Sequence, residues 1–111
     1  MSLLKFFTPS SIAVIGASRT QEKLGYTILE NLKYSFKGKI YPINPNAGEI
    51  LGLTSYSSVL DVEEPIDLAV IAVPAEMVKN VLLECKKKKV IKWCFWNSLD
   101  NVRFIIWNFS F

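Results

Sequence analysis

Continuous apolar runs alternate along the chain with segments in which apolar residues recur every three or four positions. The runs are "SIAVIGA" (11–17), "KIYPINP" (39–45) and "IDLAVIAVP" (66–74). Apolar and β-branched runs of this length that end in glycine or proline are typical of strands. We therefore predict three strands, the first of them buried on both faces.

Helical spacing fills the intervals between these runs. Between the first two strands the apolar positions are Leu24, Ile28, Leu29, Leu32 and Phe36, and Gly38 stands where such a helix would end. After the third strand they are Met77, Val78, Val81, Leu82 and Cys85, which predicts a helix from Ala75 to about Lys87. Residues 55–62 predict a short helix or turn that Pro65 ends.

Strands that alternate with helices of this length imply right-handed crossovers and a parallel sheet covered on both sides. The expected fold class is therefore α/β, a Rossmann-like parallel sheet with helices on both faces. A length of 111 residues fits one domain.

The formal charge of +3 is unevenly distributed. Residues 1–85 hold seven Lys/Arg against nine Asp/Glu, a net of −2, whereas residues 86–111 hold six against one, a net of +5. A nucleic-acid site needs basic residues spread over one face or stacked among aromatic side chains. The first 85 residues offer neither, so we expect no nucleic-acid partner.

The sequence offers no basis for a membrane or metal site. It lacks an apolar run long enough for a membrane span, and its first residues are a poor match to a secretory leader. Cys85 and Cys94 have no CxxC spacing, and the chain contains no histidine to complete a metal set. We expect a cytoplasmic protein with buried thiols, no membrane contact and no metal.

The turn after the first strand carries the candidate chemistry. Gly16 and Ala17 allow the backbone to approach a ligand, Ser18 adds a hydroxyl, and Gly25 permits close packing where the helix starts. Arg19 and Lys23 add positive charge beside a helix N-terminus, which favours anions. A purely structural turn is the alternative. We expect Gly16→Val to abolish ligand binding and to leave most of the fold intact.

A dinucleotide fingerprint is absent from this turn. The glycines are Gly16 and Gly25 rather than GxGxxG, and the second strand ends in Asn44-Pro45 rather than in an acid that would bind a ribose hydroxyl. This argues against NAD and favours another anionic ligand.

Three segments taken together resemble a known family. "SIAVIGAS" followed by "KLGY", "GKIYPINP" with "EILG", and "IDLAVIAVPA" are similar to the coenzyme A-binding domain of nucleoside-diphosphate-forming acyl-CoA synthetases, which include ADP-forming acetate–CoA ligase and relatives of the succinyl-CoA synthetase alpha subunit. The resemblance runs from about Phe6 to Cys85.

The resemblance implies a role for each matching position. Gly16, Ala17 and Ser18, with Arg19 and Lys23, would face the phosphates of CoA. Asn44, Pro45 and Asn46 would lie against the nucleotide, and Val73 and Pro74 would lie beside the pantetheine arm. Judged alone, Pro74 and Asn44-Pro45 are equally well explained as a strand stop and a turn.

The expected function is that of a CoA-binding domain, or of a fragment of such a synthetase. The family carries its phosphoryl group on a histidine, and this chain has none, so we expect no catalysis by the chain alone and a dependence on the remaining synthetase domains or subunit. The alternative is a regulatory Rossmann domain that binds NAD(H) or another nucleotide without catalysis.

The resemblance fails in the last part of the chain. All three tryptophans follow Lys89, and no glycine or proline occurs there. We divide the chain into a CoA-binding domain (1–88) and an atypical aromatic and basic tail (89–111), which leaves the sheet incomplete at its C-terminus. Either "VIKWCFW" and "VRFIIWNF" are a fourth and a fifth strand, or a reading-frame slip at the lysine codons produced the tail.

We expect a fourth strand to pair beside the first one. Trp93 and Trp96 would then partly obstruct CoA, and no strand position would suit the residues after Ser98. Weak CoA binding and poor solubility follow from this expectation.

Overall fold

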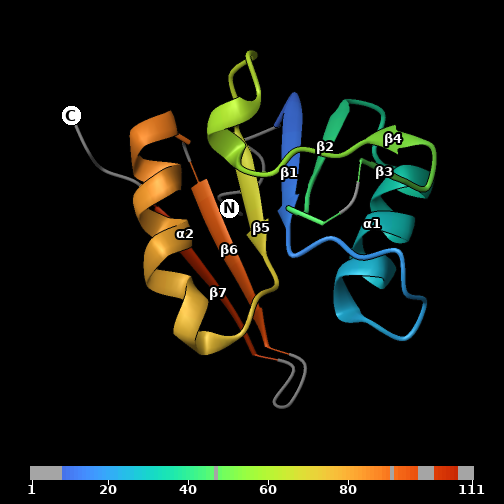
Figure 1. Cartoon of the computed structure of the whole chain (residues 1–111). Coiled ribbons are helices and arrows are strands. Elements are labelled where there is room, and N and C mark those ends of the chain that lie inside the picture. Colours follow the sequence, from blue (N-terminus) through green and yellow to red (C-terminus); the bar gives the residue numbers. More distant parts are fainter. Residues whose placement is uncertain (1–8, 47, 91, 98–101, 108–111) are drawn as a thin grey trace, which may run out of the picture.

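The computed structural model describes residues 9–46, 48–90, 92–97 and 102–107 (Figure 1). The main sheet contains β1 (Ser11–Ile15), β2 (Lys39–Ile43), β5 (Leu68–Ile71), β6 (Lys92–Asn97) and β7 (Val102–Trp107). The helices are α1 (Leu24–Ser35) and α2 (Ala75–Lys88). Two short strands, β3 (Glu49–Ile50) and β4 (Leu53–Thr54), form a hairpin that is followed by a 3₁₀ turn, η2 (Val59–Asp61).

The strand order is β2-β1-β5-β6-β7. All pairings are parallel except β6 with β7, which confirms the predicted α/β class with a parallel sheet. The expectation that the fourth strand pairs beside the first is wrong. Both sides of β1 are already occupied, by β2 and β5, so β6 adds to the far side of β5.

The two helices pack on opposite faces of the sheet, as predicted. Ala13 and Ile15 point to the face covered by α2, where Val81 and Cys85 are buried with them. Val14, between them in sequence, points to the other face and packs against Leu29 of α1 and Ile50 of the hairpin. Because every residue of β1 is buried, this strand is the centre of both cores.

Local backbone geometry sets the helix ends. α1 ends at Ser35, ahead of the expected Gly38, because Phe36 already has an extended backbone (φ −100°, ψ 129°). α2 ends where Lys89 adopts a left-handed conformation (φ 65°) and its N–H donates to the carbonyls of Cys85 and Lys86. Neither helix in the described part of the chain has the length and hydropathy needed to cross a bilayer.

Ser11 and Asp67 join the amino ends of three strands. The Ser11 hydroxyl donates to the Pro65 carbonyl (2.9 Å) and accepts from the Asp67 N–H (3.0 Å). The Asp67 carboxylate accepts from the Ser10 N–H (2.7 Å), and the Asp67 carbonyl accepts from the Lys92 N–H (3.1 Å). These bonds hold β1, β5 and β6 in register at one end of the sheet.

The strands β6 and β7 of the tail both belong to the sheet. β6 pairs with β5, and β7 adds in antiparallel orientation at the edge, so the expectation that no fifth strand position exists is wrong. An antiparallel strand needs only a short connection to reach that edge. Trp93 packs against the core on the α2 face and does not line the crevice described below, whereas the ring of Trp96 lies outside the described side chains.

Candidate functional site

A crevice of about 1110 Å³ opens at the carboxyl ends of the parallel strands. Its lining comes from the ends of β1, β2 and β5, the first residues of α1, and the flank of α2. Strand order reverses here, because β1 connects through α1 to β2 on one side while β5 pairs on its other side. Ligands of open α/β sheets bind at this position.

Gly16 forms the turn at the floor of the crevice. Its backbone has a positive φ of 94°, its N–H donates to the Ile43 carbonyl (3.1 Å), and a Cβ at this position would lie 2.2 Å from the Ala72 carbonyl oxygen. A side chain here would push apart the ends of β1 and β5. A Gly16→Val variant would therefore disturb strand packing as well as ligand approach, and the expectation that it keeps most of the fold stays a prediction.

The first turn of α1 borders the crevice with its positive end. Leu24 and Gly25 line it, no acidic residue occupies the first turn, and the N-cap residue Lys23 places its positive charge at the rim. A Cβ on Gly25 would lie 1.9 Å from the Gly16 carbonyl oxygen, so the helix start packs directly on the turn, as expected from the sequence. Unpaired N–H groups and the helix dipole favour an anion here.

The structure places the predicted site residues unequally. All of them except Arg19 line the crevice: Gly16, Ala17, Ser18, Lys23, Gly25, Asn44, Pro45, Asn46, Val73 and Pro74. Arg19 is exposed and lies outside the lining. Lys23 is therefore the cation that the predicted turn brings to the crevice.

Internal hydrogen bonds already occupy two of the polar side chains. The Asn44 amide donates to the Ala17 carbonyl (2.8 Å), and its oxygen accepts from the Asn46 N–H (2.7 Å). The Ser18 hydroxyl accepts from the Thr20 N–H (3.0 Å). Asn44 thus fixes the β1 turn against the loop after β2, and it shapes the crevice through the backbone.

Sequence reasoning did not identify the α2 flank or the segment before η2 as parts of this site. Val78 and Val81 form an apolar wall, and Ser57 and Glu84 lie at its end. Glu84 accepts a short hydrogen bond from the Ser58 hydroxyl. The spacing of Val81, Glu84 and Cys85 places them on one helix face. The acid Glu84 on this otherwise apolar face was the sequence feature that could have identified it as a site residue.

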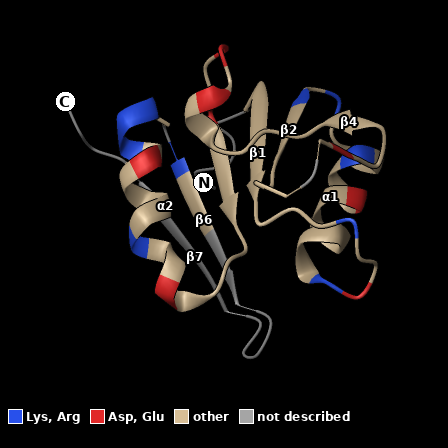
Figure 2. Cartoon of the chain, in the orientation of Figure 1, with Lys and Arg blue, Asp and Glu red and all other residues tan. Residues whose placement is uncertain are grey.

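Two features of α2 near the crevice concern charge: the buried thiol of Cys85 and the lysines of the last turn. Burial, followed by the nearby Glu84 carboxylate, raises the pKa of the Cys85 thiol to about 12. Figure 2 shows the lysines of the last turn of α2 at the opposite end of that helix from its first turn, and none of them lines the crevice. The lysine run therefore adds no cation to the site.

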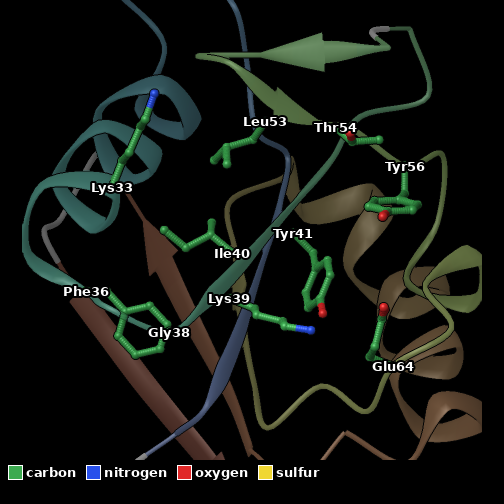
Figure 3. A pocket seen from close by; sticks show the side chains of 10 residues that line it. All are labelled: Lys33, Phe36, Gly38, Lys39, Ile40, Tyr41, Leu53, Thr54, Tyr56 and Glu64. Atoms are coloured by element: carbon green, nitrogen blue, oxygen red, sulfur yellow. The ribbon is translucent and has the colours of Figure 1, made fainter.

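A second hollow of about 450 Å³ lies along the outer edge of β2 (Figure 3). Tyr41 contributes a buried hydroxyl without a hydrogen-bond partner among the described residues, and its ring packs edge-on against Tyr56 (5.9 Å between centroids). Burial, then the Glu64 carboxylate, raises the pKa of Tyr41. This hollow shares no residue with the crevice and contains none of the predicted site residues. The described residues also contain no group of three potential metal ligands.

Comparison with known families and curated proteins gives a consistent result. The CoA binding domain family matches residues 10–102. The chain is 59% identical over 88 residues to the ADP-forming acetate–CoA ligase of Methanocaldococcus jannaschii, a match that covers 78% of this chain and 12% of that protein. It is 47% identical over 85 residues to the alpha subunit of ADP-forming acetate–CoA ligase II of Pyrococcus furiosus, covering 77% and 19%.

Solved structures agree with these relatives. The dinucleotide-forming acetyl-coenzyme A synthetase 1 of Ca. Korarchaeum cryptofilum, in complex with phosphate and ADP, superposes with a TM-score of 0.74 at 50% identity, covering 80% of this chain and 19% of that one. A conserved hypothetical protein of Pyrococcus furiosus gives a TM-score of 0.72 at 33% identity, covering 81% and 79%. The chain thus spans between about an eighth and a fifth of the ligase and synthetase chains compared here.

Proposed function

The chain belongs to the CoA binding domain family, and from this premise we propose that it binds coenzyme A in the crevice at the carboxyl ends of β1, β2 and β5. The phosphates would lie on the Gly16–Ser18 turn, beside Lys23 and the N-terminus of α1. The nucleotide would lie against Asn44–Asn46, and the pantetheine arm beside Val73 and Pro74. The alternative of a regulatory NAD(H)-binding domain is not favoured. In NAD-binding domains an acid at the end of the second strand accepts a hydrogen bond from the ribose, and here that position is the amide Asn44.

One observation carries this proposal: a single crevice combines a cationic, acid-free helix start with an apolar wall. Lys23, Leu24 and Gly25 form the first part, and Val78 and Val81 belong to the second. CoA has the matching division into a phosphorylated nucleotide and an uncharged arm. Amides and a cation suit its phosphates, and an apolar wall suits the neutral portion.

The chain would serve as one part of a larger acyl-CoA synthetase. The acetate–CoA ligases that it matches are several times longer, and the sequence contains no histidine to carry a phosphoryl group. We therefore propose that other synthetase domains or a partner subunit supply the chemistry of ligation, and that this chain supplies CoA. The buried free thiol of Cys85 fits a reducing, cytoplasmic compartment.

Calorimetric titration of the chain with CoA, NADH and ADP tests the function. We expect CoA to bind most tightly. Lys23→Gln should weaken CoA binding about three- to tenfold, since Lys23 is exposed and its charge is screened by solvent. The matched control is Lys79→Gln, an exposed lysine of α2 outside the crevice, which should leave CoA affinity unchanged. Tighter binding of NADH than of CoA would contradict the proposal.

A further inference from the structure

Glu84 is a carboxylate in a crevice otherwise suited to anions. Among the described residues that line the crevice, the charged ones are Lys23 and Glu84. Lys23 precedes α1, whereas Glu84 lies three turns into α2, beside Ser57 and the start of η2. The crevice therefore has an electropositive end and an electronegative end.

The electronegative end is held in place by a hydrogen bond. Ser58 donates its hydroxyl to one carboxylate oxygen of Glu84 and also accepts from the Leu60 N–H at the start of η2 (3.1 Å). The side chain of Glu84 is only partly buried, and its second oxygen has no partner among the described residues. That oxygen is available as an acceptor at the end of the crevice.

The end of β2 and the loop after it lie beside the electronegative end of the crevice. Ile43, which is 4% exposed, and the loop Asn44–Asn46 line the crevice there. The Asn44 N–H donates to the Tyr56 carbonyl (2.8 Å), so Ser57 follows directly beside the end of β2. A nucleotide against Asn44–Asn46 would therefore direct its base toward Ser57 and Glu84.

We propose that Glu84 accepts a hydrogen bond from the exocyclic amino group of the adenine base, so that it selects a 6-amino purine over a 6-oxo purine. This inference rests on the proposed function, because it assumes that CoA occupies the crevice. A carboxylate accepts hydrogen bonds and cannot donate them, so an amino group satisfies it and a carbonyl at the same ring position repels it. The same charge repels phosphate and orients the ligand with its phosphates toward Lys23.

Binding of CoA and of deamino-CoA, in which hypoxanthine replaces adenine, tests this selectivity. The native chain should bind CoA about ten- to a hundredfold more tightly than deamino-CoA. Glu84→Gln has nearly the same size and can both donate and accept, so the ratio should fall to within about threefold. The matched control Glu76→Gln, an exposed acid in the first turn of α2, should keep the native ratio.

Adenosine 3′,5′-bisphosphate, which lacks the pantetheine arm, separates the two ends of CoA. Its affinity should change on Glu84→Gln by the same factor as that of CoA. A change confined to CoA would place the carboxylate beside the pantetheine arm and overturn the proposal. Ser58→Ala provides a second variant in which Glu84 itself is retained, and it should preserve the preference for CoA.

The outcomes for the native chain separate this inference from the proposed function. If CoA does not bind, the proposed function fails and the inference fails with it. If CoA binds and deamino-CoA binds equally well, the function stands and only the role of Glu84 is overturned. Neither result depends on a variant that must fold.

Discussion

Single residues set the geometry of the crevice through close backbone contacts. Gly16 and Gly25 meet where the first turn packs against the start of α1, and neither has room for a Cβ. Asn44 links the same turn to the loop after β2. The geometry at the electropositive end of the crevice is thus fixed by backbone packing rather than by flexible charged side chains.

Replacement of Gly25 by alanine tests this contact. Its Cβ would lie 1.9 Å from the Gly16 carbonyl oxygen, so helix and turn must separate, at a cost of about 1–3 kcal/mol in the free energy of unfolding. We expect a lower melting temperature and weaker CoA binding. Gly48→Ala is the matched control, because a Cβ there meets no atom within 4 Å. Equal stability of the two variants would contradict the role given to Gly25.

Cys85 provides a prediction for pH dependence. The pKa of its buried thiol rises from 9.0 to about 12, so the folded chain retains the proton after the unfolded chain has lost it. The free energy of unfolding should therefore fall as pH rises above about 9, by up to about 1.4 kcal/mol per pH unit. In a Cys94→Ser variant, Cys85 is the one remaining thiol, so alkylation reports on Cys85 alone. Iodoacetamide at pH 8 should modify Cys85 in urea and should not modify it in the folded state. Similar rates in both states would show that the thiol is accessible.

At the scale of elements, sequence patterns predicted the long units and the short turn within residues 55–62, and they missed the hairpin. The three apolar runs became β1, β2 and β5, and the two periodic segments became α1 and α2, because their patterns extend over enough residues to be distinctive. The hairpin of β3 and β4 has only two residues in each strand, too few to show a period.

Site prediction had the same limit. The crevice residues next to the strand ends were predicted, because a parallel sheet brings those ends together. Glu84 and Ser57 were missed, since their place in the crevice depends on how α2 packs against η2. The position of the fourth strand was mispredicted because its apolar pattern fits a place beside β1 or beside β5 equally well, and the pairing of β5 with β1 leaves only the place beside β5.

The short hairpin nevertheless contributes to the core. Ile50 is 1% exposed and packs with Val14 and Leu29, so Ile50→Ala should lower the free energy of unfolding by about 2–5 kcal/mol. Leu60→Ala, at a position that is 46% exposed, is the control and should cost much less. Urea denaturation of both variants measures the difference. If Ile50→Ala cost no more than Leu60→Ala, the hairpin would be peripheral to folding.

At the scale of the whole molecule, the two edges of the sheet differ. β2 carries Pro42, which has no N–H to offer, and the Tyr56 N–H already occupies the Pro42 carbonyl (2.9 Å). β7 has β6 as its single partner among the described strands, and its sequence "VRFIIW" has one charge. The β7 edge is therefore the more exposed to pairing with another chain. The predicted boundary between a CoA-binding domain (1–88) and a tail (89–111) stays a prediction.

We expect the 111-residue chain to associate through the β7 edge. Sedimentation velocity should show a mass that rises with protein concentration, and Ile105→Lys should reduce the association by placing a charge on an edge strand. Leu83→Lys, at an exposed apolar position of α2, is the control and should leave association unchanged. A chain that stays monomeric at every concentration would contradict this prediction, and with it the expected poor solubility.

The bonds around Ser11 also constrain the order in which the chain acquires its structure. β1 is the first of the described strands to be synthesised, yet the partners of Ser10 and Ser11 at Pro65 and Asp67 lie 54 to 57 positions later. During synthesis, β1 therefore cannot form these bonds until Asp67 has emerged from the ribosome. Closing so long a loop before the main pairing forms slows the search for the native state. The apolar strand β1, which is fully buried in the folded chain, thus stays without its β5 partner while the intervening residues are synthesised.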